Sequence, residues 1–508
     1  MSRFIKYLFT FSFSILLVGA CGERRETWPV SNDRDRLTWN DNPDPLRPQF
    51  HYTADSNFLS DPNGLVYYNG EYHLFHQYNP YDIRSGVPQH WAHAVSHDLI
   101  HWERLPIAIY PHGGGNIWSG SAVVDRNNTS GLQTGSDPPI VAFYTWHKDF
   151  SQRMTYSNDG GETWTEYEGN PVVDHIHGRN RDPKVFWHEP SGQWIMILYV
   201  KQFEIFVSDN LKDWTNTSSL ELDDFHECPD FFELPVDSDP DLTRWVVVDG
   251  AGRYYIGDFD GSEFTPESGW HYSDWNALRR QGHTGSRKGE FYATQTWSNM
   301  PVEDGRRIQI AAMRDVRYRL PQKKFHNQMT FPCELTLRTT DEGIRLFRWP
   351  VKEIEQLYET EKSWTGVVLQ PGHRMMLAEG ELLDIRATLQ FPPSDHEIRK
   401  HVLPWDPLSF RFTIRGIDVH YDVWQQEINC HGATAPLKVD KNGVLSIRIL
   451  VDRISFEVFG NGGRSSISIY VNPLPENRSA TLDCTGGVVK INELKVYRLK
   501  PAVPSTFR

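Results

Sequence analysis

Residues 154–164 read Met-Thr-Tyr-Ser-Asn-Asp-Gly-Gly-Glu-Thr-Trp, a strand-like run that ends in Ser and Asp and reaches a Trp after a short turn. Residues 93–102 and 205–214 follow the same plan, and residues 254–264 form a looser copy that ends in Phe. The copies recur about every 50 to 60 residues, close to the roughly 40 to 50 residues of a four-stranded propeller blade. This regular repetition predicts successive blades of a β-propeller.

Flanking sequence extends the propeller and adds a second domain. Residues 307–312 supply a strand for a fifth blade. Val351, Ile354 and Leu357 stand three residues apart, which indicates a short helical connector. From about residue 360 onward, short alternating strands such as residues 447–451 indicate a β-sandwich. A single unspecified sandwich remains the alternative, although repetition over about 250 residues argues against it.

The predicted fold is therefore all-β: a five-bladed β-propeller followed by a C-terminal β-sandwich domain. We expect the following order along the chain: a lipoprotein signal peptide at 1–21, a tether at 22–47, the propeller catalytic domain at 48–349, a connector at 350–360 and the sandwich at 361–508.

Composition supports this fold class and excludes some partners. The 508 residues include 18 Trp, 37 Gly and 32 Pro, and 13% are aromatic, as suits short strands joined by tight turns. The formal net charge is −14, and no basic stripe is present. Nucleic-acid binding requires clustered Lys and Arg, so we expect no nucleic-acid partner.

The N-terminus has the features of an export signal. Arg3 and Lys6 precede an apolar run at residues 7–20, which is too short to span a bilayer comfortably. The run ends in Leu-Val-Gly-Ala-Cys at residues 17–21, which resembles a bacterial lipobox with Cys21 as the lipidated residue. An ordinary signal peptide is the alternative. We expect export and attachment to a bacterial membrane through this lipid anchor alone.

The remaining cysteines, Cys228, Cys333, Cys430 and Cys484, are widely and irregularly spaced. This spacing matches no zinc signature and no dense disulfide framework, so neither a metal nor a cofactor is predicted. A bridge between Cys430 and Cys484 is possible in an exported protein, but spacing alone does not bring two Cβ atoms together.

Three carboxylates introduce predicted blades in similar ways. Asp61 and Asp182 each precede a Pro at the start of an apolar run, and Glu227 precedes the next such run. Innermost strands converge on a propeller's axis, so the three acids are predicted to share one funnel. Facing carboxylates raise one another's pKa, which provides the proton donor and the anion that glycoside hydrolysis requires. Simple strand capping by Asp-Pro is the competing interpretation.

The motifs around these acids resemble glycoside hydrolase family 32, the invertase, inulinase and levanase group. The blocks occur in the family's order and extend from about residue 47 to 345. The matching blocks are residues 47–52, 60–64, 75–80, 91–96, 118–121, 181–183, 227–230, 291–295 and 328–332, with a fainter match at 456–459.

The resemblance implies a β-fructofuranosidase that cleaves terminal β-D-fructofuranosyl linkages of levan or inulin, with sucrose as a further candidate substrate, and with retention of configuration. It implies that Asp61 is the nucleophile, that Glu227 is the acid/base and that Asp182 holds fructose hydroxyls. We expect Cys228 to tune Glu227. The expected substrate contacts are Ser60, Asn63, Gln77, Trp118, Ser119, Arg181, Tyr292 and Gln295.

Two departures from the family pattern concern the sugar pocket. Ser60 stands where the family usually has Asn before the nucleophile, and Gly86 stands where an outer Trp is often found. Three competing interpretations remain open: a related propeller glycosidase that acts on pentosans, a lipid-anchored binding protein that has lost catalysis, and an enzyme that transfers fructose to another sugar.

Overall fold

The computed structural model describes residues 44–503, except 85, 224, 277–288, 317–322 and 392–407. The predicted signal peptide with Cys21 and nearly all of the predicted tether lie outside these residues. Within the described ranges the regular structure is almost entirely strand, with short 3-10 helices at 352–357 and 461–463. This part of the chain contains no helix long and apolar enough to cross a membrane.

Strands before residue 351 form five antiparallel blades, each written here from its inner to its outer strand. The first blade contains β1 (Asn57–Tyr68), β2 (Glu71–Asn79), β3 (His90–Ser96) and β4 (Glu103–Ile109). The second contains β5 (Ile117–Val124), β6 (Ile140–Trp146), β7 (Ser151–Ser157) and β8 (Thr165–Glu166). The third contains β9 (Arg181–His188), β10 (Gln193–Tyr199), β11 (Phe203–Ser208) and β12 (Thr215–Leu220).

The last two blades are linked by one parallel bridge between β13 and β22. The fourth blade contains β13 (Asp230–Val236), β14 (Asp239–Val248), β15 (Arg253–Phe259) and β16 (Phe264–Pro266), with β17 (His271–Tyr272) also paired to β15. The fifth contains β18 (Phe291–Thr296), β19 (Arg307–Met313), β22 (Cys333–Thr340) and β23 (Gly343–Pro350), with β21 (Gln328–Met329) paired to β19. A short strand, β20 (Phe325–His326), pairs in parallel with β1.

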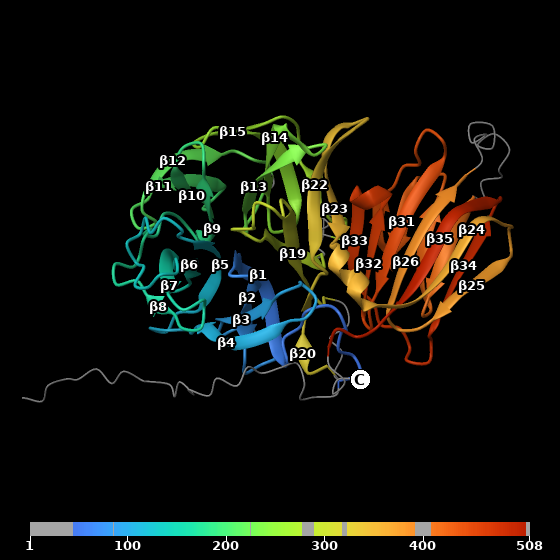
Figure 1. Ribbon diagram of the computed structural model, residues 1–508, viewed down its shortest axis with the longest axis horizontal. Helices are drawn as coiled ribbons and strands as arrows, with labels where there is room; N and C mark the ends of the chain where they lie inside the picture. Colours follow the sequence, from blue (N-terminus) through green and yellow to red (C-terminus); the bar gives the residue numbers. More distant parts are fainter. Residues whose placement is uncertain are drawn as a thin grey trace, which may run out of the picture. The chain divides into compact units, whose positions relative to one another are not determined.

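The innermost strands face one another across the centre of the propeller. β1 lies against both β5 and β18, β5 lies against β9, and β13 lies against β18. Figure 1 shows the blades following the colour order of the chain, from blue through green to yellow, around this centre. The five-bladed propeller predicted from the sequence is present, and its inner strands bring distant segments of the chain together.

The repeated sequence element corresponds to the third strand of a blade. β3 ends at Ser96, β7 at Ser157 and β11 at Ser208, and the looser copy falls in β15. The polar residue two positions after each of these serines orders the following turn: Asp159 Oδ1, for example, accepts a 2.9 Å hydrogen bond from the Thr163 backbone N–H. The repeat therefore marks the turn that leads to the fourth strand of each blade.

The connector has helical geometry of the tighter 3-10 kind, at η1 (Lys352–Leu357). A spacing of three residues matches the three residues per turn of this helix, so the apolar side chains stack along one side. Ile354 and Leu357 are buried, as is Val351 just before the helix. The prediction of a short helical connector is confirmed, and its period specifies the helix type.

Beyond the connector, two six-stranded antiparallel sheets contain the remaining strands. One sheet has the order β24 (Tyr358–Leu369), β35 (Val489–Leu499), β26 (Leu383–Gln390), β31 (Val444–Val451), β32 (Ser455–Gly460) and β33 (Ser465–Tyr470). The other has the order β25 (Arg374–Glu379), β34 (Ser479–Thr485), β27 (Ser409–Ile414), β28 (Ile417–Asp422), β29 (Glu427–Cys430) and β30 (Ala433–Pro436). These sheets form the predicted C-terminal sandwich.

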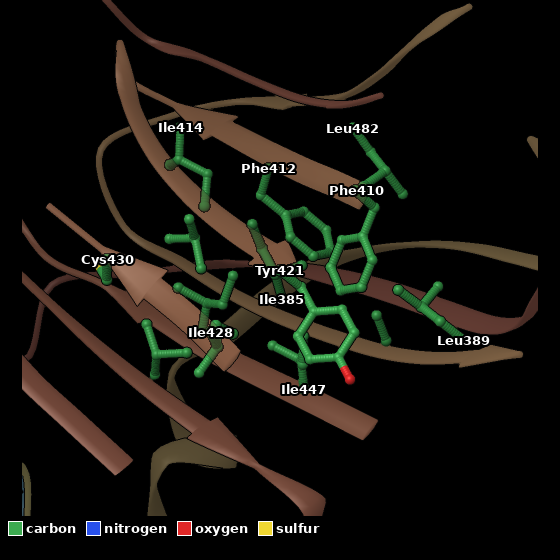
Figure 2. Close-up of a cluster of buried hydrophobic side chains, with 14 of the residues drawn as sticks. Ile385, Leu389, Phe410, Phe412, Ile414, Tyr421, Ile428, Cys430, Ile447 and Leu482 are labelled. Carbon is green, nitrogen blue, oxygen red and sulfur yellow. The ribbon is translucent and has the colours of Figure 1, made fainter. Parts of the chain in front are cut away.

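Alternate residues of the facing strands fill the space between the two sheets. Ile385 and Leu389 from β26 meet Phe410 and Phe412 from β27, together with Tyr421 from β28 (Figure 2). All five side chains are fully buried. Each buried side chain of this size contributes about 1.5 to 3 kcal/mol of transfer free energy, so this core stabilises the sandwich.

Cys430 and Cys484 lie on different strands of one sandwich sheet, β29 and β34. β28 and β27 separate these two strands, which places their backbones about 14 Å apart at the usual strand spacing. A disulfide requires Cα atoms within about 7 Å, so the two thiols are not joined.

A buried histidine ties the segment before β1 to the sandwich. Nδ1 of His51 lies 2.8 Å from Asp452 Oδ2, and Nε2 lies 2.9 Å from Glu457 Oε1. Burial alone lowers the pKa of His51, but the hydrogen bonds to Asp452 and Glu457 outweigh it and raise the pKa to about 9. A charged imidazolium therefore bridges two carboxylates in the protein interior.

Candidate active site

All three predicted acids line one open pocket at the centre of the propeller. Asp61 lies inside β1, which begins at Asn57, and not before the strand as the Asp-Pro pattern suggested. Asp182 is the second residue of β9, and Glu227 lies just before β13. The residues that line the pocket are Asp61, Gln77, Gln89, Trp118, Ser119, Arg179, Arg181, Asp182 and Glu227.

Asp61 stands at an irregular part of its strand. The pairing of β1 with β2 shifts register between Leu59 and Pro62, because Pro62 has no N–H to donate to the ladder. A bulge of this kind redirects the side chain beside it. The Asp-Pro dipeptide therefore turns Asp61 toward the pocket from within a strand.

Both carboxylate oxygens of Asp61 accept hydrogen bonds from serine hydroxyls. Ser60 Oγ donates to Oδ1 at 2.7 Å, and Ser119 Oγ donates to Oδ2 at 2.8 Å. Behind Ser119, the Gln77 amide donates to the Ser119 oxygen at 2.5 Å, and Gln89 donates to Gln77 Oε1 at 2.6 Å. This relay fixes the orientation of the Asp61 carboxylate.

Arg181 holds the Glu227 carboxylate. Its Nε and Nη2 donate to Glu227 Oε2 at 2.8 and 2.5 Å, and its Nε lies 3.6 Å from Asp182 Oδ2. The Glu227 main chain is also fixed, since its carbonyl accepts a 2.8 Å hydrogen bond from Gly250 N–H. A Cβ at Gly250 would lie 2.9 Å from that carbonyl oxygen, so a larger residue would displace Glu227.

Asp182 is the most deeply buried of the three acids. Its side chain is 6% exposed, compared with 32% for Glu227. Burial and the neighbouring Glu227 carboxylate raise the pKa of Asp182 to about 7, although Arg181 opposes the rise. The φ angle of Asp182 is 64°, a left-handed conformation that is uncommon for residues other than glycine and that clusters at functional sites.

The Cys228 thiol contacts two of the three acids, Asp182 and Asp61. Its Sγ lies 3.4 Å from Asp182 Oδ2 and 3.8 Å from Asp61 Oδ2, and its backbone N–H donates to Asp182 Oδ2 at 3.0 Å. Burial, reinforced by these carboxylates, raises the pKa of the thiol, so it remains protonated and can donate. Cys228 thus contacts Asp182 and Asp61, and the expectation that it tunes Glu227 stays a prediction.

Four of the predicted substrate contacts, Gln77, Trp118, Ser119 and Arg181, line the pocket itself. Ser60 is a partly buried neighbour of Asp61, and its hydroxyl is directed to the carboxylate.

The other predicted substrate contacts stand outside this lining. Asn63 is fully buried, and in one of its two amide orientations it accepts from the Gln77 backbone N–H at 3.2 Å. Gln295 donates to the Gly120 carbonyl at 2.9 Å. Tyr292 is 8% exposed, and the Arg314 guanidinium lies 3.8 Å from its ring centre. Asn63 and Gln295 thus bond to backbone groups of neighbouring strands, whereas Tyr292 packs in a buried cluster with Cys228 and Ala293.

Two pocket residues, Gln89 and Arg179, were not among the predicted contacts. Each lies within a few residues of a matched motif, before Trp91 and before Arg181 respectively. The sequence offered one signal for these two residues: each is a polar or charged residue close to a matched block. Neither residue belongs to a block, so motif matching did not select it.

The described residues contain no group of three His, Cys, Asp or Glu side chains arranged to hold a metal ion. Independently of that finding, the pocket brings together three carboxylates: one oriented by two hydroxyls, one held by an arginine and one buried. Paired carboxylates of this kind perform glycoside hydrolysis. The fold and the site together define a propeller-type glycosidase.

Comparison with known proteins specifies the class further. Residues 51–350 match the description "Glycosyl hydrolases family 32 N-terminal domain", and residues 412–498 match "Glycosyl hydrolases family 32 C terminal". The chain belongs to this family and is a glycoside hydrolase.

Individual relatives agree with this assignment. The chain is 38% identical to a levanase of Bacillus subtilis (strain 168), over 89% of this chain and 70% of the relative. It is 30% identical to an extracellular exo-inulinase of Aspergillus awamori, over 90% of this chain and 95% of the relative. The crystal structure of the exo-inulinase from Aspergillus awamori superimposes with a TM-score of 0.78 at 28% identity, covering 91% of this chain and 99% of the other.

Proposed function

We propose that this enzyme hydrolyses terminal β-D-fructofuranosyl linkages of fructans such as levan or inulin, and also of sucrose. The observation that carries the proposal is the convergence of Asp61, Asp182 and Glu227 on one pocket. Levanase and exo-inulinase relatives that align along most of the chain support fructan as the substrate.

The first half-reaction forms a covalent fructosyl-enzyme. An oxygen of Asp61 attacks the anomeric C2 while the bond from C2 to the glycosidic oxygen breaks. Glu227 donates its proton to that oxygen, which leaves as a hydroxyl of the remaining sugar. Arg181 keeps the Glu227 carboxyl in place through two hydrogen bonds to Oε2.

In the second half-reaction, Glu227 accepts a proton from water as the water oxygen attacks C2. The bond between C2 and Asp61 then breaks, which releases fructose with its original configuration and restores both carboxyls. Retention of this kind requires the two carboxyl groups to lie roughly 5 to 5.5 Å apart. Asp182, when ionised, accepts hydrogen bonds from fructose hydroxyls as positive charge develops on the ring.

We also propose that the protein is exported and anchored by lipid at Cys21, with residues 1–21 as the signal peptide and 22–47 as the tether before the propeller of 48–349. The relative from Aspergillus awamori is described as extracellular, which supports export. The lipobox-like residues 17–21 support the anchor. Labelling with a lipid precursor tests this, since a Cys21→Ser variant should lose the label.

Chromatography of the products tests the reaction. Incubation with inulin, levan, sucrose and arabinan should release free fructose from the fructans. Oligomers as the first products would indicate endo action, and turnover of arabinan with inert fructans would overturn the proposal in favour of a pentosan glycosidase. Fructosylated acceptors in place of fructose would indicate transfer.

A further inference from the structure

Arg179 has an unusual position at the mouth of the pocket. It is exposed, yet it belongs to the pocket lining. Its guanidinium carbon lies 4.8 Å from the centre of the Trp118 ring and 5.9 Å from that of Phe150. Within the described part of the chain no carboxylate or carbonyl accepts a hydrogen bond from this guanidinium. Its five N–H donors therefore face solvent at the mouth of the pocket.

The aromatic support beneath Arg179 is held firmly. Phe150 has a φ angle of 58°, which is strained for a bulky residue and persists only where neighbours fix the backbone. Its carbonyl accepts hydrogen bonds from Asn180 Nδ2 at 2.7 Å and from Gln152 Nε2 at 3.0 Å. Its N–H donates to the Trp146 carbonyl at 2.9 Å. The aromatic support of Arg179 is thus pre-organised before any ligand binds.

Asn180 connects this support to the loop that carries Arg179. Its fully buried side chain reaches Phe150 across the blade boundary, and its Oδ1 accepts from Ile176 N–H at 3.0 Å. The main-chain carbonyl of Arg179 in turn accepts a 2.6 Å hydrogen bond from Arg181 Nη1. The main chain of Arg179 is therefore fixed by Arg181, the arginine that holds the acid/base, and its guanidinium lies over the aromatic support.

The relative burial of the acids indicates which part of the substrate lies near Arg179. Asp182 is enclosed at the base of the pocket, whereas Glu227 is partly exposed toward solvent. The leaving sugar must depart past the group that protonates it, and so past Glu227. Arg181 donates hydrogen bonds both to the Glu227 carboxylate and to the main-chain carbonyl of Arg179. Arg179 therefore lies on this leaving-group side of the pocket.

We propose that Arg179, supported by Trp118 and Phe150, binds the hydroxyls of the sugar on the leaving-group side of the scissile bond. This inference rests on the proposed function and names a specificity-determining residue for it. A guanidinium that already lies over aromatic rings loses less freedom when it binds than a free one, and charged donors form stronger hydrogen bonds than neutral ones.

The test compares two substrates that differ only in the leaving group. A fructan trisaccharide places a sugar at the mouth of the pocket, whereas methyl β-D-fructofuranoside releases methanol. In Arg179→Ala, the ratio of kcat/KM for the trisaccharide to that for the methyl fructoside should fall about tenfold, the loss expected for a charged hydrogen bond. Arg179→Lys keeps the charge but not the planar fork, and should give an intermediate ratio.

Arg338 provides a matched control. It is also exposed and lies over an aromatic ring, 4.6 Å from the centre of Phe347, but it belongs to β22 and not to the pocket. Arg338→Ala should leave the ratio unchanged. An Arg179→Ala variant that loses both activities equally, or neither, would overturn the inference.

A binding measurement separates this inference from the reaction itself. In the Asp61→Asn background, calorimetry should show the trisaccharide binding about tenfold more weakly when Arg179 is also replaced by Ala. Fructose affinity should change less than twofold. Equal weakening for both ligands would contradict the inference. Failure of the wild-type enzyme to turn over either substrate would instead contradict the proposed function.

Discussion

The Ser60 hydroxyl donates a 2.7 Å hydrogen bond to Oδ1 of Asp61, the residue immediately after it. The family pattern led us to expect a sugar contact from this position. In the structure, Ser60 and Ser119 donate to the two oxygens of the carboxylate, one to each. The shorter side chain thus serves to orient the proposed nucleophile.

Replacement of Ser60 by Ala should lower kcat on levan or inulin about tenfold, because Asp61 loses a hydrogen bond made to a charged group. Ser60→Thr retains the hydroxyl and should keep most of the rate. Steady-state kinetics on both variants measure this effect. Equal activity of Ser60→Ala and wild type would show that Ser119 alone suffices to orient Asp61.

Replacement of Arg181 by Gln should shift the pH dependence of kcat/KM. Burial and Glu227 raise the pKa of Asp182 to about 7, and Arg181 opposes that rise. Loss of the positive charge should raise the pKa further, by about one unit. An ionised Asp182 accepts hydrogen bonds from fructose hydroxyls more strongly than a protonated one, so the variant should lose more activity at pH 6 than at pH 8.

A full pH profile of wild type and Arg181→Gln provides the measurement, with Arg338→Gln as a control outside the pocket. A proportional loss at every pH would show that Arg181 acts only by holding Glu227. A larger loss at high pH would contradict the assigned role of Asp182.

Gly86→Trp should restore an aromatic wall that this chain lacks. A Cβ at Gly86 would lie 3.7 Å from Gln89 Nε2, at the pocket lining, and 3.3 Å from Phe58 Cε1, which a small shift can accommodate. The narrower mouth should favour sucrose over levan in the ratio of their kcat/KM values. Gly135→Trp is a suitable control, because a Cβ at Gly135 has no neighbour within 4 Å. An unchanged ratio in Gly86→Trp would contradict the claim that a side chain at residue 86 narrows the mouth of the pocket.

His51 should make stability depend on pH. Its pKa is about 9 in the folded protein and about 6.5 in the unfolded chain. The folded state therefore retains a proton that the unfolded state releases. Stability from this site is fully present below pH 6.5 and is lost as pH rises through 9, by roughly 3 kcal/mol in total.

Thermal unfolding of wild type and His51→Gln between pH 6 and 10 measures this contribution. The wild-type Tm should exceed that of the variant at pH 6, and the difference should shrink as pH rises. A constant difference across this range would mean that His51 is not charged in the folded protein.

The sequence predicted the features that recur or that depend on local geometry. The serines at positions 96, 157 and 208 revealed the blades because each ends the same strand of a repeated unit. The three carboxylates were found because inner strands of a propeller converge. The position of Asp61 within β1 was missed, since a bulge depends on pairing with β2 and not on the Asp-Pro sequence alone.

The sequence did not predict which side chains point into the pocket. Asn63 belongs to a matched block and is fully buried, whereas Arg179 belongs to none and lines the pocket. Alternation along a strand determines which residues face the centre, and bulges change that alternation locally. Contacts such as the stacking of Arg179 on Trp118 also join different blades, so no spacing within one segment encodes them.

The most direct test of the three-carboxylate mechanism is to trap the fructosyl-enzyme. Glu227→Gln should form the covalent intermediate from a fructoside with a good leaving group, such as fructosyl fluoride, but break it down slowly. Mass spectrometry of peptides should then find one fructosyl residue on Asp61, and none in Asp61→Asn/Glu227→Gln. An adduct on another residue, or full hydrolytic activity in Asp61→Asn, would contradict the mechanism.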